Sequence, residues 1–199
     1  MHFSSDVERA LRVASKAHAG QTRKGEETAY VTHPFHVALM LGRAGADDVT
    51  LQAALLHDVV EDCDGWTIAR IKDLFGVEVA AIVEDLTEVK GGSWEERKEE
   101  ALLKVAGMGE RSLAVKTADK LHNMRTLAAR LADAEDPREV WAHFSRGPGP
   151  TLDYARRLGE ALRERLGARQ GGSAGHLAGT RSLAYELCEV VEGLLHGLP

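Results

Sequence analysis

The chain has 199 residues, of which 44% are hydrophobic and 28% are charged, and its formal net charge is −6. This composition predicts a folded globular protein rather than a disordered one, and a net negative charge argues against broad nucleic-acid binding. The first residues include acids where a secretion signal would be apolar, and no uncharged run predicts a membrane span, so we expect a cytoplasmic protein.

Apolar residues recur with helical spacing along nearly the whole chain, which predicts an all-α globule of roughly seven to nine helices. Ser5 is the expected cap of the first helix, and a polar loop separates that helix from a second one that begins near Pro34. Asp47 or Asp48 begins the next helix, which contains residues 55–64. The starts expected further along are Thr67, Ser93 with Glu96 in a capping box, and Asp136 before Pro137.

The longest predicted helix spans residues 112–134, and another covers residues 151–167. Residues 168–180 are rich in glycine and alanine and predict a flexible linker. A last amphipathic helix is expected from residue 181 onwards. We therefore expect a compact domain over residues 1–167, followed over residues 168–199 by a glycine-rich linker and an extra C-terminal helix.

The segment LLHDVVEDCD, residues 55–64, places one imidazole and several carboxylates in an apolar helix. At about 100° per residue, His57, Asp58, Glu61 and Asp62 fall within an arc of about 140° on one continuous helix. Such a face would repel itself without a cation, whereas imidazole and carboxylate together bind divalent metals such as Mn²⁺, Fe²⁺ or Zn²⁺. An ordinary solvated helix face is the other interpretation of the same acids.

Two further segments carry potential ligands of the same kind. His33 lies in YVTHPFHV at a helix start, and Asp119 lies in AVKTADKLHNMRT. Alone, the histidine would be an ordinary cap and the aspartate an ordinary partner of a nearby lysine. Together with His57 and Asp58 they make two imidazoles and two carboxylates, a set that can hold one metal and leave positions open for water.

The segments AHAGQTRKG, YVTHP, LLHDVVED and VKTADKLHNMRTL, in this order, resemble the hydrolase domain of RelA/SpoT-type enzymes in the HD metal-dependent phosphohydrolase superfamily. The similarity extends over about residues 5 to 165, and WEERK at 94–98 resembles the single-domain branch, the small alarmone hydrolases. The segment TLDYARRL departs from that branch, because Tyr154 is its one aromatic residue. The resemblance implies a compact HD-type helical fold and hydrolysis of the alarmones ppGpp and pppGpp.

The resemblance also implies a cofactor, Mn²⁺, and three groups of site residues. The acids of the ED pair would orient or deprotonate water. A planar guanidinium suits stacking on a purine, which is the role implied for Arg23. The implied site residues are the metal ligands His33, His57, Asp58 and Asp119, the catalytic acids Glu61 and Asp62, and the substrate-binding residues Arg23, Lys24, Asn123 and Thr126. Arg97 and Lys98 could also reach phosphates.

The leading hypothesis is therefore Mn²⁺-dependent removal of the 3′-pyrophosphate from ppGpp or pppGpp, giving GDP or GTP and pyrophosphate. Hydrolysis of another nucleotide, ppApp or NADPH, is the alternative within the same class, because the sequence does not show base specificity. A non-catalytic alarmone sensor ranks lower, because the metal ligands and both acids are retained. The expected partner is a small nucleotide, without nucleic acid or membrane, and the sequence leaves the oligomeric state open.

Overall fold

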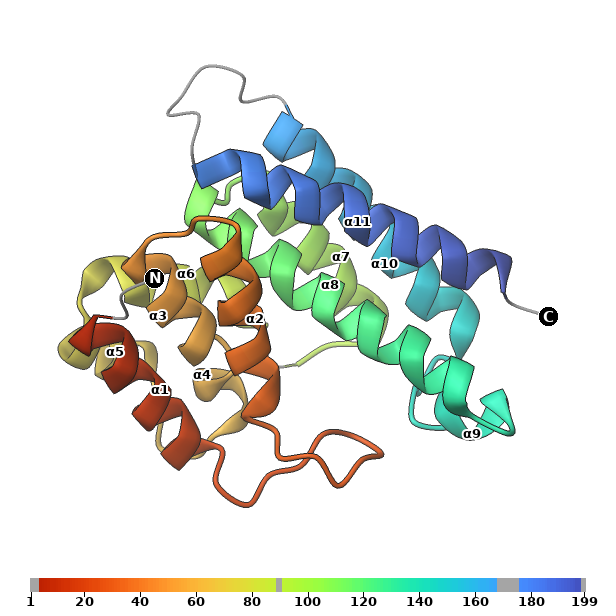
Figure 1. The fold of residues 1–199 in the computed structure, drawn as a ribbon, viewed down its shortest axis with the longest axis horizontal. Helices are drawn as coiled ribbons and strands as arrows, with labels where there is room; N and C mark the ends of the chain where they lie inside the picture. The colour runs from red at the N-terminus through yellow and green to blue at the C-terminus, as the bar shows by residue number, and fades with distance from the viewer. Residues whose placement is uncertain (1–3, 89–90, 168–175, 198–199) are drawn as a thin grey trace.

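The computed structural model describes residues 4–88, 91–167 and 176–197, and within these ranges the chain forms eleven α-helices around one apolar core (Figure 1). The expectation of an all-α fold is confirmed. The β-structure of the described residues consists of one isolated antiparallel bridge between Thr22 and Ala29. The helices are α1 (Ser5–Ala17), α2 (Thr32–Arg43), α3 (Asp48–Leu56), α4 (Val59–Asp62), α5 (Ile68–Phe75), α6 (Val77–Leu86), α7 (Trp94–Val105), α8 (Glu110–Asp133), α9 (Pro137–Trp141), α10 (Pro148–Gly167) and α11 (His176–His196).

Most of the predicted helix starts are confirmed by their caps. The side chains of Asp47, Thr67 and Asp136 each accept a hydrogen bond from a backbone N–H in the first helical turn. Ser93 and Glu96 form the expected reciprocal capping box at the start of α7. The first helix differs, because its cap is Ser4 and not Ser5, with the Ser4 hydroxyl accepting from the N–H of Val7.

Helix α8 runs through the middle of the fold and contacts α2, α3, α6, α10 and α11 (Figure 1). Its buried residues follow helical spacing, with Leu113, Leu121 and Leu127 among them. The expected long helix at residues 112–134 therefore corresponds to α8, which begins two residues earlier, at Glu110. A helix in this position can carry side chains from the apolar core to a site formed by its neighbours.

Helix α11, the blue helix of Figure 1, lies along α8 and α10. Its side chains Ala184, Leu187 and Val191 are buried in the core, so the expected extra C-terminal helix is confirmed. Residues 168–175 of the expected linker lie outside the described residues. For residues 176–180 the prediction of a linker is wrong, because these residues are helical. A side chain at Gly179 would collide with the backbone of Ala44, so the small residue allows the close approach to the end of α2.

Within the described ranges, the helices are too short or too polar for any of them to cross a lipid bilayer.

Candidate metal site and active-site cavity

A cavity of about 260 Å³ opens between the first half of the chain and helices α7, α8 and α10. It gathers most of the predicted site residues, which are far apart in the sequence. The predicted residues that line it are Arg23, His33, His57, Asp58, Glu61, Asp119 and Asn123. Among the residues that the structure describes, its lining does not include Lys24, Asp62 or Thr126.

The turn between α3 and α4 carries two of the predicted ligands. The sequence predicts one continuous helix here, but α3 ends at Leu56 and α4 begins at Val59. His57 and Asp58 lie between them with right-handed backbone angles, and Asp58 has φ −93° and ψ −8°, in the bridge region. The expected continuous helix is therefore wrong, although His57, Asp58 and Glu61 still line the same cavity.

Three side chains are close enough to hold one cation. His33, His57 and Asp58 each offer one ligand atom, and these atoms lie within 4.8 Å of one another. The fourth predicted ligand, Asp119, places Oδ1 3.2 Å from His33 Nε2 and 3.9 Å from His57 Nε2. Neutral imidazole and carboxylate are ligands that divalent first-row metals accept. The cluster can therefore hold a divalent metal.

His57 provides a further test of whether a metal fits. Its side chain is 4% exposed, and Nε2 is the one buried side-chain nitrogen or oxygen in the described chain that has no hydrogen-bond partner. Although burial opposes the charged form, the carboxylates of Asp58 and Asp119 raise the pKa of the His57 imidazole. A buried nitrogen without a partner is costly, so its position beside two carboxylates fits a site that a cation completes.

Each histidine ligand is held through its second ring nitrogen. His57 Nδ1 lies 2.6 Å from the backbone oxygen of Ala54, one turn earlier. His33 lies in the first turn of α2 beside Pro34, and its Nδ1 lies 2.8 Å from Nδ1 of His122 on α8. Burial, together with the neighbouring His33, lowers the pKa of His122 to about 3, so His122 is neutral at pH 7. Such outer contacts fix the ring orientation of metal ligands.

The carboxylate ligands are held by hydrogen bonds from neighbouring side chains. The Tyr30 hydroxyl lies 2.8 Å from Asp58 Oδ2 and 2.9 Å from Asp62 Oδ2. Burial and these two carboxylates raise the pKa of Tyr30, which keeps its proton as the donor. On α8, Asn123 Nδ2 donates to Asp119 Oδ1 at 2.7 Å. Tyr30 was not predicted as a site residue, because its partners lie 28 and 32 residues away in the sequence.

The two predicted catalytic acids have different surroundings. Glu61 lines the cavity, and its Oε2 accepts a hydrogen bond of 3.1 Å from the backbone N–H of Glu88. Asp62 is held by Tyr30, and its backbone oxygen accepts from Gln21 Nε2 at 2.8 Å. Burial, with Asp58 nearby, raises the pKa of both acids. Raised pKa values suit groups that exchange protons.

The same cavity has a cationic part of its lining, which we call the cation wall. Arg97 Nε and Lys98 Nζ pair with Glu88 at 3.2 and 3.0 Å. Lys120 Nζ lies 4.9 Å from the centre of the Tyr154 ring, and its buried position lowers its pKa to about 8. The residues of the cation wall are Arg97, Lys98, Lys104, Lys116 and Lys120. Lys104, Lys116 and Lys120 were missed as site residues, although Lys116, Asp119 and Asn123 recur at helical spacing.

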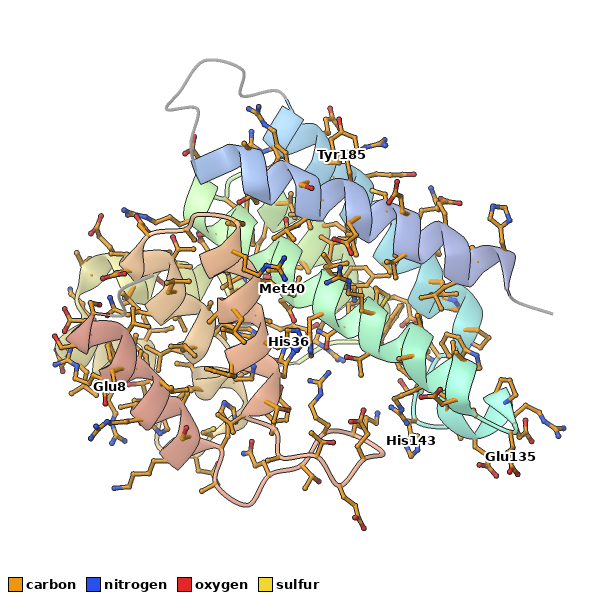
Figure 2. All side chains as sticks on the ribbon, viewed as in Figure 1. Glu8, His36, Met40, Glu135, His143 and Tyr185 are labelled. Atoms are coloured by element: carbon orange, nitrogen blue, oxygen red, sulfur yellow. The ribbon has the colours of Figure 1, made fainter. Side chains whose placement is uncertain are left out.

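The predicted nucleotide-binding residues are only partly brought together. Arg23 Nη2 donates to Asn123 Oδ1 at 2.8 Å, so these two meet at the cavity. The Lys24 side chain is exposed, while its backbone oxygen accepts from Arg130 at 3.0 Å. The next residue, Gly25, has φ +72°, and an added Cβ would lie 2.6 Å from His143 Nε2. Glycine therefore allows this loop to approach His143, which follows α9 and which Figure 2 shows close to the tip of the loop.

Comparison with known proteins defines the class of the protein. Residues 10–149 match the family described as HD domain. The matched range includes both histidines and both aspartates of the metal cluster and the two acids that follow. The chain belongs to the HD domain family.

Among its relatives are enzymes of alarmone metabolism. It is 38% identical over 133 residues to the bifunctional (p)ppGpp synthase/hydrolase SpoT of Escherichia coli K12, a match that covers 64% of this chain and 19% of that protein. It is 37% identical over 149 residues to a guanosine-3′,5′-bis(diphosphate) 3′-pyrophosphohydrolase of Aquifex aeolicus, with 70% and 21% covered. The chain thus spans about a fifth of the length of these two relatives.

A solved structure matches over nearly its full length. The structure described as a metazoan ortholog of SpoT that hydrolyzes ppGpp superposes with a TM-score of 0.73 at 28% identity. That match covers 100% of this chain and 99% of the other. A protein from Listeria monocytogenes EGD-e superposes with a TM-score of 0.63 at 31% identity, covering 79% of this chain and 99% of the other. The single-domain length predicted from the sequence is consistent with these structures.

Proposed function

We propose that the protein removes the 3′-pyrophosphate from ppGpp and pppGpp, giving GDP or GTP and pyrophosphate. The observation that carries this proposal is one cavity whose lining holds both the His–Asp cluster and the cation wall. A polyphosphate ester carries the charge that such a wall attracts, and its scissile bond must lie beside the acids. The relatives named as ppGpp pyrophosphohydrolases favour this substrate class.

We propose Mn²⁺ as the metal, held by His33, His57, Asp58 and Asp119. The Nε2 atoms of His33 and His57 face the two carboxylates at 3.2 to 3.9 Å, and His57 Nε2 has no hydrogen-bond partner among the described residues. When bound, a divalent cation supplies a Lewis acid that lowers the pKa of water and offsets charge on phosphoryl oxygens. Imidazole with carboxylate fits Mn²⁺, whereas thiolates would be expected at a softer site.

Glu61 and Asp62 are proposed to orient the attacking water and accept its proton. Glu61 Oε2 is occupied by the Glu88 N–H, which leaves Oε1 as the oxygen that can face the cavity. Asp62 Oδ2 is held by the Tyr30 hydroxyl, which also contacts Asp58. The two acids are thus fixed relative to the ligand turn before substrate arrives, as positioned general bases need to be.

The cation wall is proposed to bind the phosphates of the substrate. Lys98 and Arg97 are paired with Glu88, so an incoming phosphate would compete with this carboxylate for both cations. Arg23 is proposed to stack on the purine, with Asn123 hydrogen-bonded beside it. Contacts of Lys24 and Thr126 with the substrate stay predictions. They would require a substrate that extends beyond the cavity.

The decisive experiment measures phosphate or pyrophosphate release from ppGpp, ppApp and NADPH, with and without Mn²⁺, and identifies the nucleotide product. We expect GDP and pyrophosphate from ppGpp, and loss of activity with chelator. Faster turnover of ppApp or NADPH would reassign the substrate within the same reaction class. Binding of ppGpp without product in the presence of each divalent metal would show a sensor and refute the proposal.

The domain division is also proposed: residues 1–167 form the hydrolase domain, and residues 168–199 form an appended linker and helix. All described residues that line the cavity lie between residues 23 and 158. A specific protease site inserted between residues 168 and 175 would allow the connection to be cut while α11 stays docked on α8 and α10. We expect hydrolysis to be unchanged after this cut. Loss of metal binding or turnover on cleavage would refute the division.

We further propose a cytoplasmic location, because nucleotides of this kind are intracellular metabolites, and cell fractionation with an antibody against the protein would test it.

A further inference from the structure

The imidazoles of His33 and His122 are linked through the same atom type in each ring. Their Nδ1 atoms lie 2.8 Å apart, so one nitrogen must carry a proton and the other must offer a lone pair. His122 is half-buried on α8, three residues after Asp119. Its ring also lies 4.6 Å from that of His36, which Figure 2 shows between α2 and α8.

The proposed metal site decides the direction of this hydrogen bond. His33 Nε2 faces Asp119 Oδ1 at 3.2 Å and Asp58 Oδ2 at 3.6 Å, so Nε2 is the atom that can bind a cation. A metal needs the lone pair of Nε2, and the proton of the neutral ring is then on Nδ1. His33 Nδ1–H must therefore donate to His122 Nδ1, and His122 must keep its own proton on Nε2.

We propose that His122 is a positioning residue of the metal site, which accepts the hydrogen bond of His33 Nδ1–H and so fixes the tautomer and orientation of His33. The proposal rests on the proposed metal site and goes beyond it, because His122 itself is not a ligand. The second histidine ligand has an equivalent support in the backbone oxygen of Ala54, 2.6 Å from His57 Nδ1. The support of His33 is a side chain, which substitution can remove, whereas the support of His57 is a backbone oxygen.

Two substitutions separate this role from simple packing. In His122→Asn, the amide oxygen can occupy about the place of Nδ1 and keep the acceptor. In His122→Leu, a side chain of similar size removes it. His36→Leu is the matched control, because it removes a neighbouring imidazole that also contacts the His122 ring. Urea unfolding of each variant shows whether the fold is retained.

The primary measurement is the dissociation constant of Mn²⁺ and Zn²⁺ by titration calorimetry on the metal-free protein. We expect His122→Leu to bind about 10- to 100-fold more weakly, the usual range for losing an outer contact to a ligand. We expect His122→Asn to stay within about threefold of the unaltered protein, because it retains the acceptor. His36→Leu should bind as the unaltered protein does.

The second measurement is the nitrogen NMR spectrum of imidazole-labelled protein loaded with Zn²⁺, which needs no variant. We expect His33 to carry its proton on Nδ1 and His122 to carry its proton on Nε2 alone. The opposite tautomer of His122 would overturn the proposal even if His122→Leu did not fold. Unchanged metal affinity in His122→Leu, or equal losses in His122→Asn and His122→Leu, would also overturn it. If the unaltered protein bound no divalent metal, the proposed metal site itself would fail.

Discussion

The metal end, formed by the His–Asp cluster, and the cation wall are built differently. At the metal end, the side chains of His33 and His57 are 2% and 4% exposed, and contacts with His122 and with the Ala54 backbone hold them in place. At the cation wall, Lys98 and its partner Glu88 are each 24% exposed. The first arrangement fixes atoms that must be placed accurately for chemistry. The second arrangement provides positive charges whose partner, Glu88, an anionic substrate can replace. Substitutions at the metal end should therefore change metal binding and turnover, and substitutions at the cation wall should change substrate affinity.

The largest effect is expected from His57→Ala and Asp58→Ala at the metal end. Each removes a ligand atom from the cluster of three, so we expect loss of bound metal and activity below detection. Metal content by mass spectrometry and pyrophosphate release would be measured together. His143→Ala, outside the cavity lining, is the matched control. Full activity of either ligand variant in the absence of metal would show that the cluster does not act through a bound metal.

The next effect concerns the acids beside the ligands. Glu61→Gln and Asp62→Asn keep side-chain shape but cannot accept a proton from water. We expect retained Mn²⁺ and ppGpp binding, with kcat lowered about a hundredfold or more, the scale for removing a positioned general base. Bound metal, ppGpp affinity and kcat should be measured for each variant. Loss of metal in parallel with kcat would make these acids ligands, and near-normal kcat would remove them from proton transfer.

The pH dependence should sharpen the same assignment. Burial and the neighbouring carboxylates raise the pKa of Glu61 above its ordinary value of 4.5. A general base acts in its ionised form, so kcat should decline as the pH falls through this raised pKa. The decline should begin at a higher pH than an ordinary glutamate would give, and Glu61→Gln should flatten it. A profile that is identical in the unaltered protein and Glu61→Gln would assign the titration to another group.

The metal end was more accessible to sequence reasoning than the cation wall. The ligands lie in short motifs, and the caps at Asp47 and Ser93 depend on neighbours within a few residues. By contrast, Lys116 and Lys120 look like an ordinary wet helix face until α7 and α10 pack beside α8. The apolar periodicity of the sequence predicted a continuous helix through His57. Periodicity reflects neighbouring residues and carries no information about contacts that other segments make with this turn.

Long-range contacts account for the remaining differences. Tyr30 could not be assigned a role from its motif, since its hydroxyl serves two carboxylates on another element. The docking of α11 was also beyond prediction, because an amphipathic pattern shows that a face is buried without showing which helices cover it. Lys24 followed Arg23 in the same motif, but adjacent side chains in a loop point in different directions, and only that of Arg23 lines the cavity.

The cation wall should respond through substrate affinity. Lys98→Ala removes a cation that lies 3.0 Å from Glu88, and we expect KM for ppGpp to rise roughly tenfold, equivalent to about 1.4 kcal/mol. Glu88→Gln removes the competing negative charge and keeps the backbone N–H that bonds to Glu61, so KM should fall. Steady-state kinetics with bound metal as the control would measure both. If KM moved in the same direction in the two variants, the proposed competition would be wrong.

The smallest effect is expected at Arg23, which is linked to the metal end through its hydrogen bond to Asn123 and the bond from Asn123 to Asp119. Arg23→Lys keeps the positive charge but loses the planar surface and the Nη2 donor. A guanidinium on a ring contributes about 0.5 to 1 kcal/mol at exposed sites, so KM should rise about two- to fivefold. Metal content should be unchanged, because Asn123 still donates to Asp119. Lys24→Ala, with its exposed side chain, is the matched control. Reduced metal content in Arg23→Lys would show that the hydrogen-bonded chain supports the metal end, whereas unchanged kinetics would move the purine elsewhere.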